Sequence, residues 1–519
     1  MYSPSLDDIR ALRGQGNLCP IYREILADLE TPVSAYLKIA RGPHSFLLES
    51  VTGGEHIGRY SFIGSDPYLT LRMHDGAAQA VQGGYKQTLT YRDPLLVLDS
   101  YLSAYRPVRL PGLPIFVGGA VGYLSYESAR YFERIPVATD VAYAMPDSWW
   151  MFVDTLLVFD HVKHKILAVS HVHLDADDLE AEYRRATGRI EALLARLNQP
   201  LPPQPGVAAR NYDPMDEDAG LRRQDERRPV IDAPRSSQAH RIAHHPTSNI
   251  TREQFEANVL RAKEYVMAGD IFQVQISQRF SRPTSADSFT IYRALRTVNP
   301  SPYMFYIRTG EGDLVGASPE MLVQVQEGRV ETRPIAGTRW RGNDPAEDER
   351  LAAELLADEK ERAEHLMLVD LGRNDIGRVS VPGSVSVPVF MTIEKYSHVQ
   401  HIVSSVVGAL RPDLKPIDAL RACFPAGTVT GAPKIRAMEI IAELEHEQRG
   451  VYAGGVGHIG FNGDLDICIA LRTMVVKDGV AYAQAAAGVV ADSTPEYEYA
   501  ESCNKAAASL RAVEVAEGL

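Results

Sequence analysis

The chain has 519 residues, 45% of them hydrophobic, which is enough to bury a full core in one large domain or in several smaller ones. Its net charge of −13 argues against nucleic acid or an anionic membrane as the main partner, because both favour a basic surface. The four cysteines are widely spaced without a C-x-x-C pair, which argues against disulfides and a zinc site. With no signal peptide and no run of eighteen apolar residues, we expect a cytoplasmic protein.

Residues 1–198 alternate strand-like runs with turns, a pattern typical of antiparallel sheet. Strands are predicted at SAYLKIA and SFLLESV, at YLTLRM before Asp75-Gly76, and at MFVDTLLVF and KILAVSHV. Helices are predicted after Asp93-Pro94 and over DLEAEYRRATGRIEALLARL, residues 178–197. Residues 199–248 are rich in proline and in charges of both signs, so they are predicted to form a linker or surface excursion.

In residues 249–519, helices and strands alternate again. Thr251 and Gln254 have the spacing of a capping box for a helix that ends at Gly269. Strands are predicted up to about residue 334, with turns at 310–312 and 327–328, and a tail hairpin turns at Asp478-Gly479. Helices are predicted over residues 345–371 and 394–410 and after Pro433. Consecutive hairpins with helices between them predict an α+β fold.

Two pairs of glutamates have the i,i+3 spacing of one helical face. Glu361 and Glu364 share their face with apolar residues, so they are predicted to be partly buried and to need a cation. Glu498 and Glu501 repeat the spacing in a helix that begins near residues 493–496. Taken alone, the first pair is better explained as an acidic first turn that favours the helix dipole and pairs with Lys360 or Arg362, and the second as a solvated helix face with Glu501 paired to Lys505. If the two helices meet, their oxygen ligands favour Mg²⁺.

Three further features of the C-terminal half concern binding. The loop from Gly427 to Lys434 enters a helix whose N-terminus suits a carboxylate or phosphate, although a plain loop-to-helix junction explains it equally well. Gly455-x-Gly457-x-x-Gly460 matches a dinucleotide fingerprint but precedes a turn and a strand, so we reject that interpretation. Arg472 is predicted on the strand face that carries small side chains, looking into a cavity.

Taken together, these segments resemble the chorismate-utilising enzyme family. The matching strings are GDIFQVQISQRF, NPSPYMFY, GASPEMLV, RPIAGTRWRG, EHLMLVDLGRNDIGRV, FPAGTVTGAPKIRAMEII, YAGGVGHIGF, DICIALRT and the tail Glu498-x-x-Glu501-x-x-Asn504-Lys505. SFLLES and GRYSFIG extend the resemblance to the front of the chain and are similar to its anthranilate synthase component I branch. The resemblance implies large antiparallel sheets packed in a sandwich with helices outside. It also implies a regulatory, tryptophan-binding region over 1–198 and a chorismate-binding catalytic domain over 249–519, and it assigns the intervening segment 199–248 no role.

The resemblance assigns roles residue by residue. Glu364 and Glu501 match the Mg²⁺ ligands, and Glu361 and Glu498 match the carboxylates near the metal and its waters. His401, Glu320 and Thr428 match catalytic positions, Glu320 being the general acid that protonates the C4 hydroxyl. Positions that contact the substrate are Gly337, Thr338, Tyr452, Arg472, the turn Ala486-Ala487-Gly488, and Lys505. The tryptophan-binding positions are Ser50, Pro302, Tyr303 and Met304, for which sheet turns with packing roles are the alternative. Trp340 and Ala486 stand where relatives often have Pro and Gly, which leaves details of the substrate loop open.

Two absent lysines indicate the reaction. Gln273 stands where family members that add water have a lysine, and Ala336 where aminodeoxychorismate synthases commonly have one. The resemblance then implies that ammonia attacks C2 of chorismate, followed by loss of pyruvate to give anthranilate, the first step of tryptophan biosynthesis. No cysteine lies in a Gly-x-Cys-x-Gly context, so a glutamine amidotransferase subunit is expected to supply the ammonia in a hetero-oligomer. The alternatives are aminodeoxychorismate synthase, isochorismate synthase and a catalytically silent tryptophan-binding module.

Overall fold

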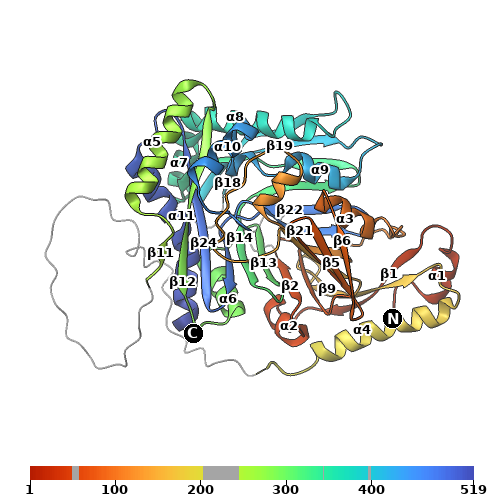
Figure 1. Cartoon of the computed structure of the whole chain (residues 1–519). Coiled ribbons are helices and arrows are strands. Elements are labelled where there is room, and N and C mark those ends of the chain that lie inside the picture. Colours follow the sequence, from red (N-terminus) through yellow and green to blue (C-terminus); the bar gives the residue numbers. More distant parts are fainter. Residues whose placement is uncertain (50–57, 203–244, 343, 396–398, 519) are drawn as a thin grey trace, which may run out of the picture.

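The computed structural model describes residues 1–49, 58–202, 245–342, 344–395 and 399–518. Within them lie two antiparallel sheets of twelve strands each (Figure 1). In spatial order, the first sheet consists of β1 (Leu18–Leu26), β10 (Lys165–His173), β9 (Leu156–Asp160), β3 (Tyr60–Ser65), β2 (Ser45–Glu49), β13 (Tyr303–Arg308), β14 (Asp313–Ser318), β23 (Thr473–Lys477), β24 (Val480–Val489), β12 (Gln273–Pro283) and β11 (Thr247–Ser248), with β20 (Gly431–Ala432) beside β12.

The second sheet consists of β17 (Ile335–Trp340), β19 (Val399–Ala409), β16 (Arg329–Thr332), β15 (Met321–Gln326), β22 (Leu465–Ile469), β21 (Gly455–Gly460), β7 (Gly119–Leu124), β8 (Ser148–Val153), β4 (Leu69–His74), β5 (Ala77–Gln82) and β6 (Tyr85–Thr90), with β18 (Ser386–Lys395) beside β19. The helices are α1 (Leu6–Ala11), α2 (Pro32–Ile39), α3 (Pro94–Leu102), α4 (Leu179–Leu197), α5 (Arg252–Ala268), α6 (Ser288–Val298), α7 (Pro345–Ala357), α8 (Glu359–Gly377), α9 (Pro416–Cys423), α10 (Lys434–Leu444) and α11 (Pro495–Gly518), with short 3₁₀ turns η1 (Tyr126–Tyr131) and η3 (Gly427–Val429).

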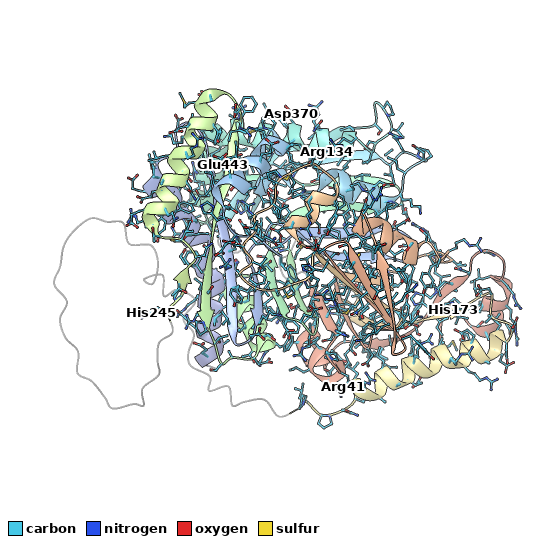
Figure 2. All side chains as sticks on the ribbon, viewed as in Figure 1. Arg41, Arg134, His173, His245, Asp370 and Glu443 are labelled. Carbon is cyan, nitrogen blue, oxygen red and sulfur yellow. The ribbon has the colours of Figure 1, made fainter. Side chains whose placement is uncertain are left out.

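The two sheets pack face to face, which confirms the predicted α+β sandwich. One buried apolar cluster takes Phe46 and Phe305 from the first sheet and Trp149 and Val456 from the second. Two other clusters lie between the outer sheet faces and the helices. Side chains fill the space between these layers (Figure 2). Helices α5, α7, α8, α10 and α11 gather at one side of the molecule, while α4 lies along the opposite side near β1 (Figure 1).

Both sheets mix strands from the two halves of the sequence. In the first sheet β2 pairs with β13, and in the second β7 pairs with β21. Neither half therefore has a sheet of its own within the described residues. The proposed boundaries near residues 198 and 249 stay a prediction, and most of the intervening segment lies outside the described residues.

Local signals placed many elements correctly. Asp93 caps α3 by accepting hydrogen bonds from the amides of Leu95 and Leu96. Thr251 accepts from the Gln254 amide at the start of α5, which ends at Gly269 with a left-handed φ of 82°. The turns at Asp75-Gly76 and Asp478-Gly479 join β4 to β5 and β23 to β24. The glycines of residues 455–460 lie in strand β21, consistent with rejecting a nucleotide loop.

Other predictions were wrong. SAYLKIA lies mostly in helix α2, where Thr31 supplies the cap and Pro32, Ala35, Tyr36 and Ile39 are buried at helical spacing. Within the predicted helix 394–410, residues 394–395 end β18 and residues 399–409 form β19, which is buried along most of its length and does not alternate. The helix over 345–371 is two helices, α7 and α8, meeting at Asp358, which caps α8. No helix in the described ranges is long and apolar enough to span a membrane.

Candidate functional site

A bulge in β17 places backbone at the centre of the candidate site. The pairing of β17 with β19 shifts between Ala336 and Thr338, and Gly337 has a left-handed φ of 67°. A Cβ atom on Gly337 would lie 3.1 Å from Glu361 Oε2, so the glycine allows β17 to approach α8 closely. The Gly337 carbonyl accepts a hydrogen bond from His401 Nδ1 at 2.8 Å, and Thr338 Oγ1 lies 3.1 Å from the same nitrogen.

His401 lies in β19, not in the helix predicted for this segment. Burial lowers the pKa of His401; the hydrogen bond to Gly337 opposes this and the positive charge of Arg472 adds to it. The ring is therefore neutral near pH 7. Because Nδ1 faces a carbonyl oxygen, the proton resides on Nδ1 and the basic nitrogen is Nε2.

The four glutamates proposed for a metal site lie on two helices, Glu361 and Glu364 on α8 and Glu498 and Glu501 on α11. Burial raises the pKa of Glu361, and the negative charge of Glu364 raises it further. On α11, burial raises the pKa of Glu498 to about 7, and Glu501 adds to that rise. The pKa of the Tyr497 hydroxyl is raised by burial and then by the charges of Glu501, Glu498 and Glu361. The two helices therefore direct their acidic groups toward one region.

This carboxylate set fits a hard divalent cation. Within the described ranges no three His, Cys, Asp or Glu side chains are grouped as ligands, but Mg²⁺ is commonly held by one or two carboxylates together with waters and substrate oxygens. Glu498 Oε2 is buried and makes no hydrogen bond in the described part of the chain. Glu501 pairs with Lys505 at 2.7 Å, the contact that helical spacing alone predicted. A cation would neutralise carboxylates that otherwise repel one another.

Gln273, at the start of β12, touches both the carboxylates and β24. Its Nε2 donates to Glu364 Oε1 at 3.2 Å. A Cβ on Gly488 would lie 2.7 Å from this Nε2 and 2.9 Å from Gln275 Nε2, so only a glycine leaves room for both amides. Residues 486–488 lie in strand β24 and not in the predicted turn, because β24 continues its pairing with β12 as far as Val489. The side chain of Ala487 is fully buried.

Two further predicted substrate contacts meet at Ala486. The amide of Ala486 donates to the Tyr452 hydroxyl and partly offsets the burial that raises the pKa of that hydroxyl. Lys505 Nζ donates to the Ala486 carbonyl at 3.1 Å while pairing with Glu501. Backbone from β24 therefore connects Tyr452 to the carboxylates of α11.

Arg472 lies in the loop between β22 and β23 and not on a strand face as predicted. Its φ is 47°, and the chain passes there from the second sheet to the first. Burial alone lowers the pKa of Arg472, since no nearby carboxylate compensates it. Among the described residues no acidic group lies within ion-pair distance of the guanidinium. A shielded cation without a carboxylate partner among the described residues suits a small anion.

Glu320 and Thr428 line one cavity beside α8 and α9. Burial raises the pKa of Glu320 to about 8, and the Thr428 hydroxyl has a smaller effect that lowers it. The Glu320 side chain is therefore mostly protonated at pH 7 and can donate a proton. Thr428 Oγ1 is buried, and it makes no hydrogen bond of regular geometry with the described residues.

Of the predicted tryptophan positions, Tyr303 and Met304 lie in β13, which pairs with β2. Met304 is opposite Glu49 in the strand ladder and is buried. The Tyr303 hydroxyl contacts Asp466, and burial followed by the charge of Asp466 raises the pKa of Tyr303. Ser50 lies outside the described residues, although β2 ends immediately before it. Sheet pairing therefore places the end of β2 beside Met304.

Reasoning from the sequence missed two basic residues beside the site. Lys434 pairs with Asp375 at 2.8 Å and fixes the loop that carries Thr428 to α8. Arg449 is almost completely buried and bonds to segments near residues 275, 429 and 445. Its pair with Glu445 has local i,i+4 spacing, but the carbonyls that it bonds near residues 275 and 429 are far away in the sequence, so no local pattern could have identified these contacts.

Most of the chain is similar to known proteins. Residues 43–511 match the family model described as chorismate binding enzyme. The chain is 48% identical to anthranilate synthase component 1 of a Synechocystis strain and 44% identical to that of Acetivibrio thermocellus, over 99% of both chains in each case.

Solved structures give the same grouping. Anthranilate synthase component I from Streptococcus pneumoniae superposes with a TM-score of 0.71 at 36% identity, covering 93% of this chain and 98% of its own. A menaquinone-specific isochorismate synthase from Escherichia coli shares the fold with a TM-score of 0.65 at 18% identity, covering 98% of both chains. The chain therefore belongs to the family of chorismate binding enzymes.

Proposed function

We propose that this chain is the chorismate-converting component of an anthranilate synthase, catalysing the first step of tryptophan biosynthesis. The observation that carries the proposal is Arg472, a shielded cation without a carboxylate partner among the described residues, in the site that also gathers four glutamates. Chorismate carries two carboxylates. Arg472 suits the enolpyruvyl carboxylate through a bidentate contact, and the glutamate set suits the other carboxylate through a divalent cation.

Glu364 and Glu501 would hold Mg²⁺, and Glu361 and Glu498 would lie near the ion and its waters. When bound, the ion supplies positive charge for the ring carboxylate of chorismate. The buried Glu320 is protonated at neutral pH and would donate its proton to the departing C4 hydroxyl, with Thr428 as a neighbouring hydrogen-bonding group. His401, neutral and fixed by the Gly337 carbonyl, would offer Nε2 to the substrate.

The nucleophile is proposed to come from outside the chain. The Gln273 amide is engaged with Glu364, and an amide cannot act as a base near neutral pH. Ala336 offers only a buried methyl group. Ammonia would attack C2 as the C4 hydroxyl leaves, and elimination of pyruvate would give anthranilate.

Two regulatory and assembly features belong to the same proposal. The relatives are named component 1, which supports a second subunit, and a glutamine amidotransferase is the chemistry that supplies ammonia. Tryptophan is proposed to bind where β2 ends beside Tyr303 and Met304 and to inhibit the reaction. A tryptophan titration that leaves the rate unchanged would remove the second feature.

One assay tests the proposed function. The purified chain is incubated with chorismate, Mg²⁺ and ammonium at alkaline pH, and anthranilate is followed by its fluorescence. We expect anthranilate and pyruvate in equal amounts and no product after Mg²⁺ is chelated. Isochorismate, aminodeoxychorismate or no product with a folded protein would each contradict the proposal.

A further inference from the structure

Arg449 makes a set of contacts that no role described so far explains. It follows α10, and its side chain is 1% exposed. It forms a buried ion pair with Glu445, with Nε donating to Oε2 and Nη2 to Oε1, both at 2.7 Å. The guanidinium also lies 4.7 Å from the ring centroid of Tyr126 and 5.7 Å from that of Tyr452. Arg449 thus contacts both Tyr452, which is a predicted substrate contact, and the buried carboxylate of Glu445.

Arg449 also holds the loop that carries Thr428. Nη1 donates to the carbonyl of Val429 at 2.7 Å, and Nη2 donates to the carbonyl of Gln275 at 2.8 Å. The Gln275 amide in turn donates to the Thr430 carbonyl at 2.9 Å. The loop is therefore linked to strand β12 at Gln275 in two ways. Arg449 bonds to both the Val429 and the Gln275 carbonyls, and the Gln275 amide bonds directly to the Thr430 carbonyl.

Glu445 extends this network to β24. Besides Arg449, it accepts a hydrogen bond from the amide of Ser277 at 2.6 Å. Ser277 lies opposite Ala486 in the strand ladder, and Ala486 contacts both Tyr452 and Lys505. The Arg449–Glu445 pair therefore sits behind the segments that carry Thr428, Tyr452 and Ala486.

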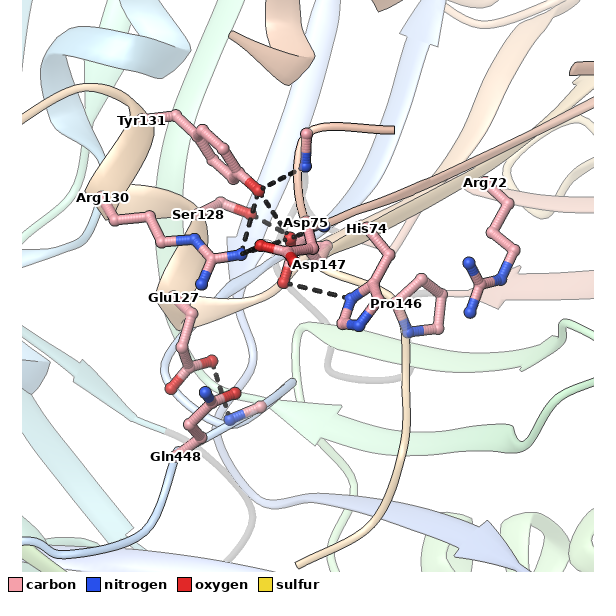
Figure 3. A network of polar contacts seen from close by, with 12 residues as sticks. Arg72, His74, Asp75, Glu127, Ser128, Arg130, Tyr131, Pro146, Asp147 and Gln448 are labelled. Atoms are coloured by element: carbon pink, nitrogen blue, oxygen red, sulfur yellow. Dashed lines mark hydrogen bonds and ion pairs between the residues drawn. The ribbon is translucent and has the colours of Figure 1, made fainter. Parts of the chain in front are cut away.

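The N-terminal half fixes the backbone of Arg449. The buried Glu127 accepts hydrogen bonds from the amides of Arg449 and Gly450 at 2.7 and 3.0 Å. Glu127 belongs to η1, which is itself held because Arg130 and Tyr131 donate to Asp147. Figure 3 shows both contacts, with Glu127 reaching the chain beside Gln448.

We infer that Arg449 is a positioning residue for the proposed reaction: it sets the Thr428 loop and Tyr452 against the substrate without touching the substrate. The inference rests on the proposed function. Lysine retains the charge for Glu445 but cannot reach both carbonyls with a planar fork, so the loop would be free to shift. A shift of about 1 Å in a positioned group lowers the rate by about 100-fold.

Arg449→Lys is compared with Arg282→Lys. Arg282 is a matched control because it is also a buried, ion-paired arginine. Its partners are Glu514 and Glu517, and it lies at the far end of β12. We expect Arg449→Lys to lower kcat about 100-fold with the KM for chorismate changed less than about threefold. Arg282→Lys should keep kcat within about twofold. Hydrogen exchange should accelerate at residues 427–433 in Arg449→Lys alone.

The outcomes separate the two claims. A wild-type chain that makes no anthranilate contradicts the proposed function, whereas the exchange measurement still tests the loop contacts. Equal kcat values for the two variants, or unchanged protection of residues 427–433, would overturn the role of Arg449. If Arg449→Lys does not fold, Glu445→Asp serves instead. The shorter side chain draws the guanidinium back by about one methylene and should lower kcat in the same way. A wild-type kcat in Glu445→Asp would also overturn the role of Arg449.

Discussion

Replacing Glu320 with glutamine should change how the stability of the protein depends on pH. The carboxyl is buried, and its pKa is raised from 4.5 to about 8. At about 1.4 kcal/mol per pH unit, ionising Glu320 is on the order of 5 kcal/mol less favourable in the folded than in the unfolded chain. Between pH 4.5 and pH 8 the folded state binds the extra proton, so this group makes the free energy of unfolding decrease as pH rises.

Glutamine has similar volume but does not titrate, so Glu320→Gln removes this dependence. Urea unfolding of both proteins at several values between pH 5 and pH 9 measures the difference in the free energy of unfolding. We expect the variant to gain stability relative to wild type steadily as pH rises toward 8 and to hold that gain above it. A difference that is the same at every pH would refute the assignment of a raised pKa to Glu320.

The same substitution separates stability from catalysis. If Glu320 is the acid, Glu320→Gln should lower kcat by about 10²- to 10⁴-fold even where it is more stable than wild type. The kcat of the wild-type enzyme should fall above about pH 8, as the acid ionises. A variant with normal kcat would leave Glu320 as a buried carboxyl without a catalytic role.

Three other substitutions test separate parts of the site. Glu364→Gln should reduce turnover by at least about 100-fold and weaken Mg²⁺ binding in calorimetry without changing the melting temperature; activity that still responds to Mg²⁺ at wild-type levels would contradict the metal assignment. Arg472→Met removes an unpaired shielded cation, so unfolding in urea should show equal or greater stability, while the KM for chorismate rises about 100-fold. Gly488→Ala places a Cβ 2.7 Å from Gln273 Nε2, so at least one amide must move. In that variant kcat should fall about tenfold or more in a protein that still folds, and a wild-type kcat would show that the placement of Gln273 is unimportant.

Elements with capping or turn signals were predictable from the sequence, because those signals act within a few residues. Asp93 and Thr251 cap the helices that follow them, and Gly269 ends α5 as expected. Buried strands gave weaker signals. β19 is buried on both faces, and its sequence VQHIVSSVVGA groups polar and apolar residues in pairs, so no period of two was visible. The reverse error at Tyr36 came from a short helix, because a short apolar run does not by itself distinguish a helix from a strand.

The candidate site was predictable in its composition and not in its geometry. Helical spacing placed Glu361 beside Glu364, but only the fold brings α11 to the same region. Spacing also predicted that Arg472 lies on a strand, whereas it occupies a left-handed position where the chain changes sheets. That position depends on pairing partners far away in the sequence, which local patterns do not encode.

The interleaving of the two halves affects how the N-terminal region can influence catalysis. The residues assigned to catalysis and substrate binding lie between 320 and 505, yet the backbone of Arg449 is fixed by Glu127, and β13 pairs with β2. Removing residues 1–198 would expose the partner edges of β13 and β21 and leave the amides of Arg449 and Gly450 without their acceptor. A ligand that changes the end of β2 acts on a strand that shares its sheet with β24, so its effect can reach Ala486 through the packed sheet without a hinge between domains.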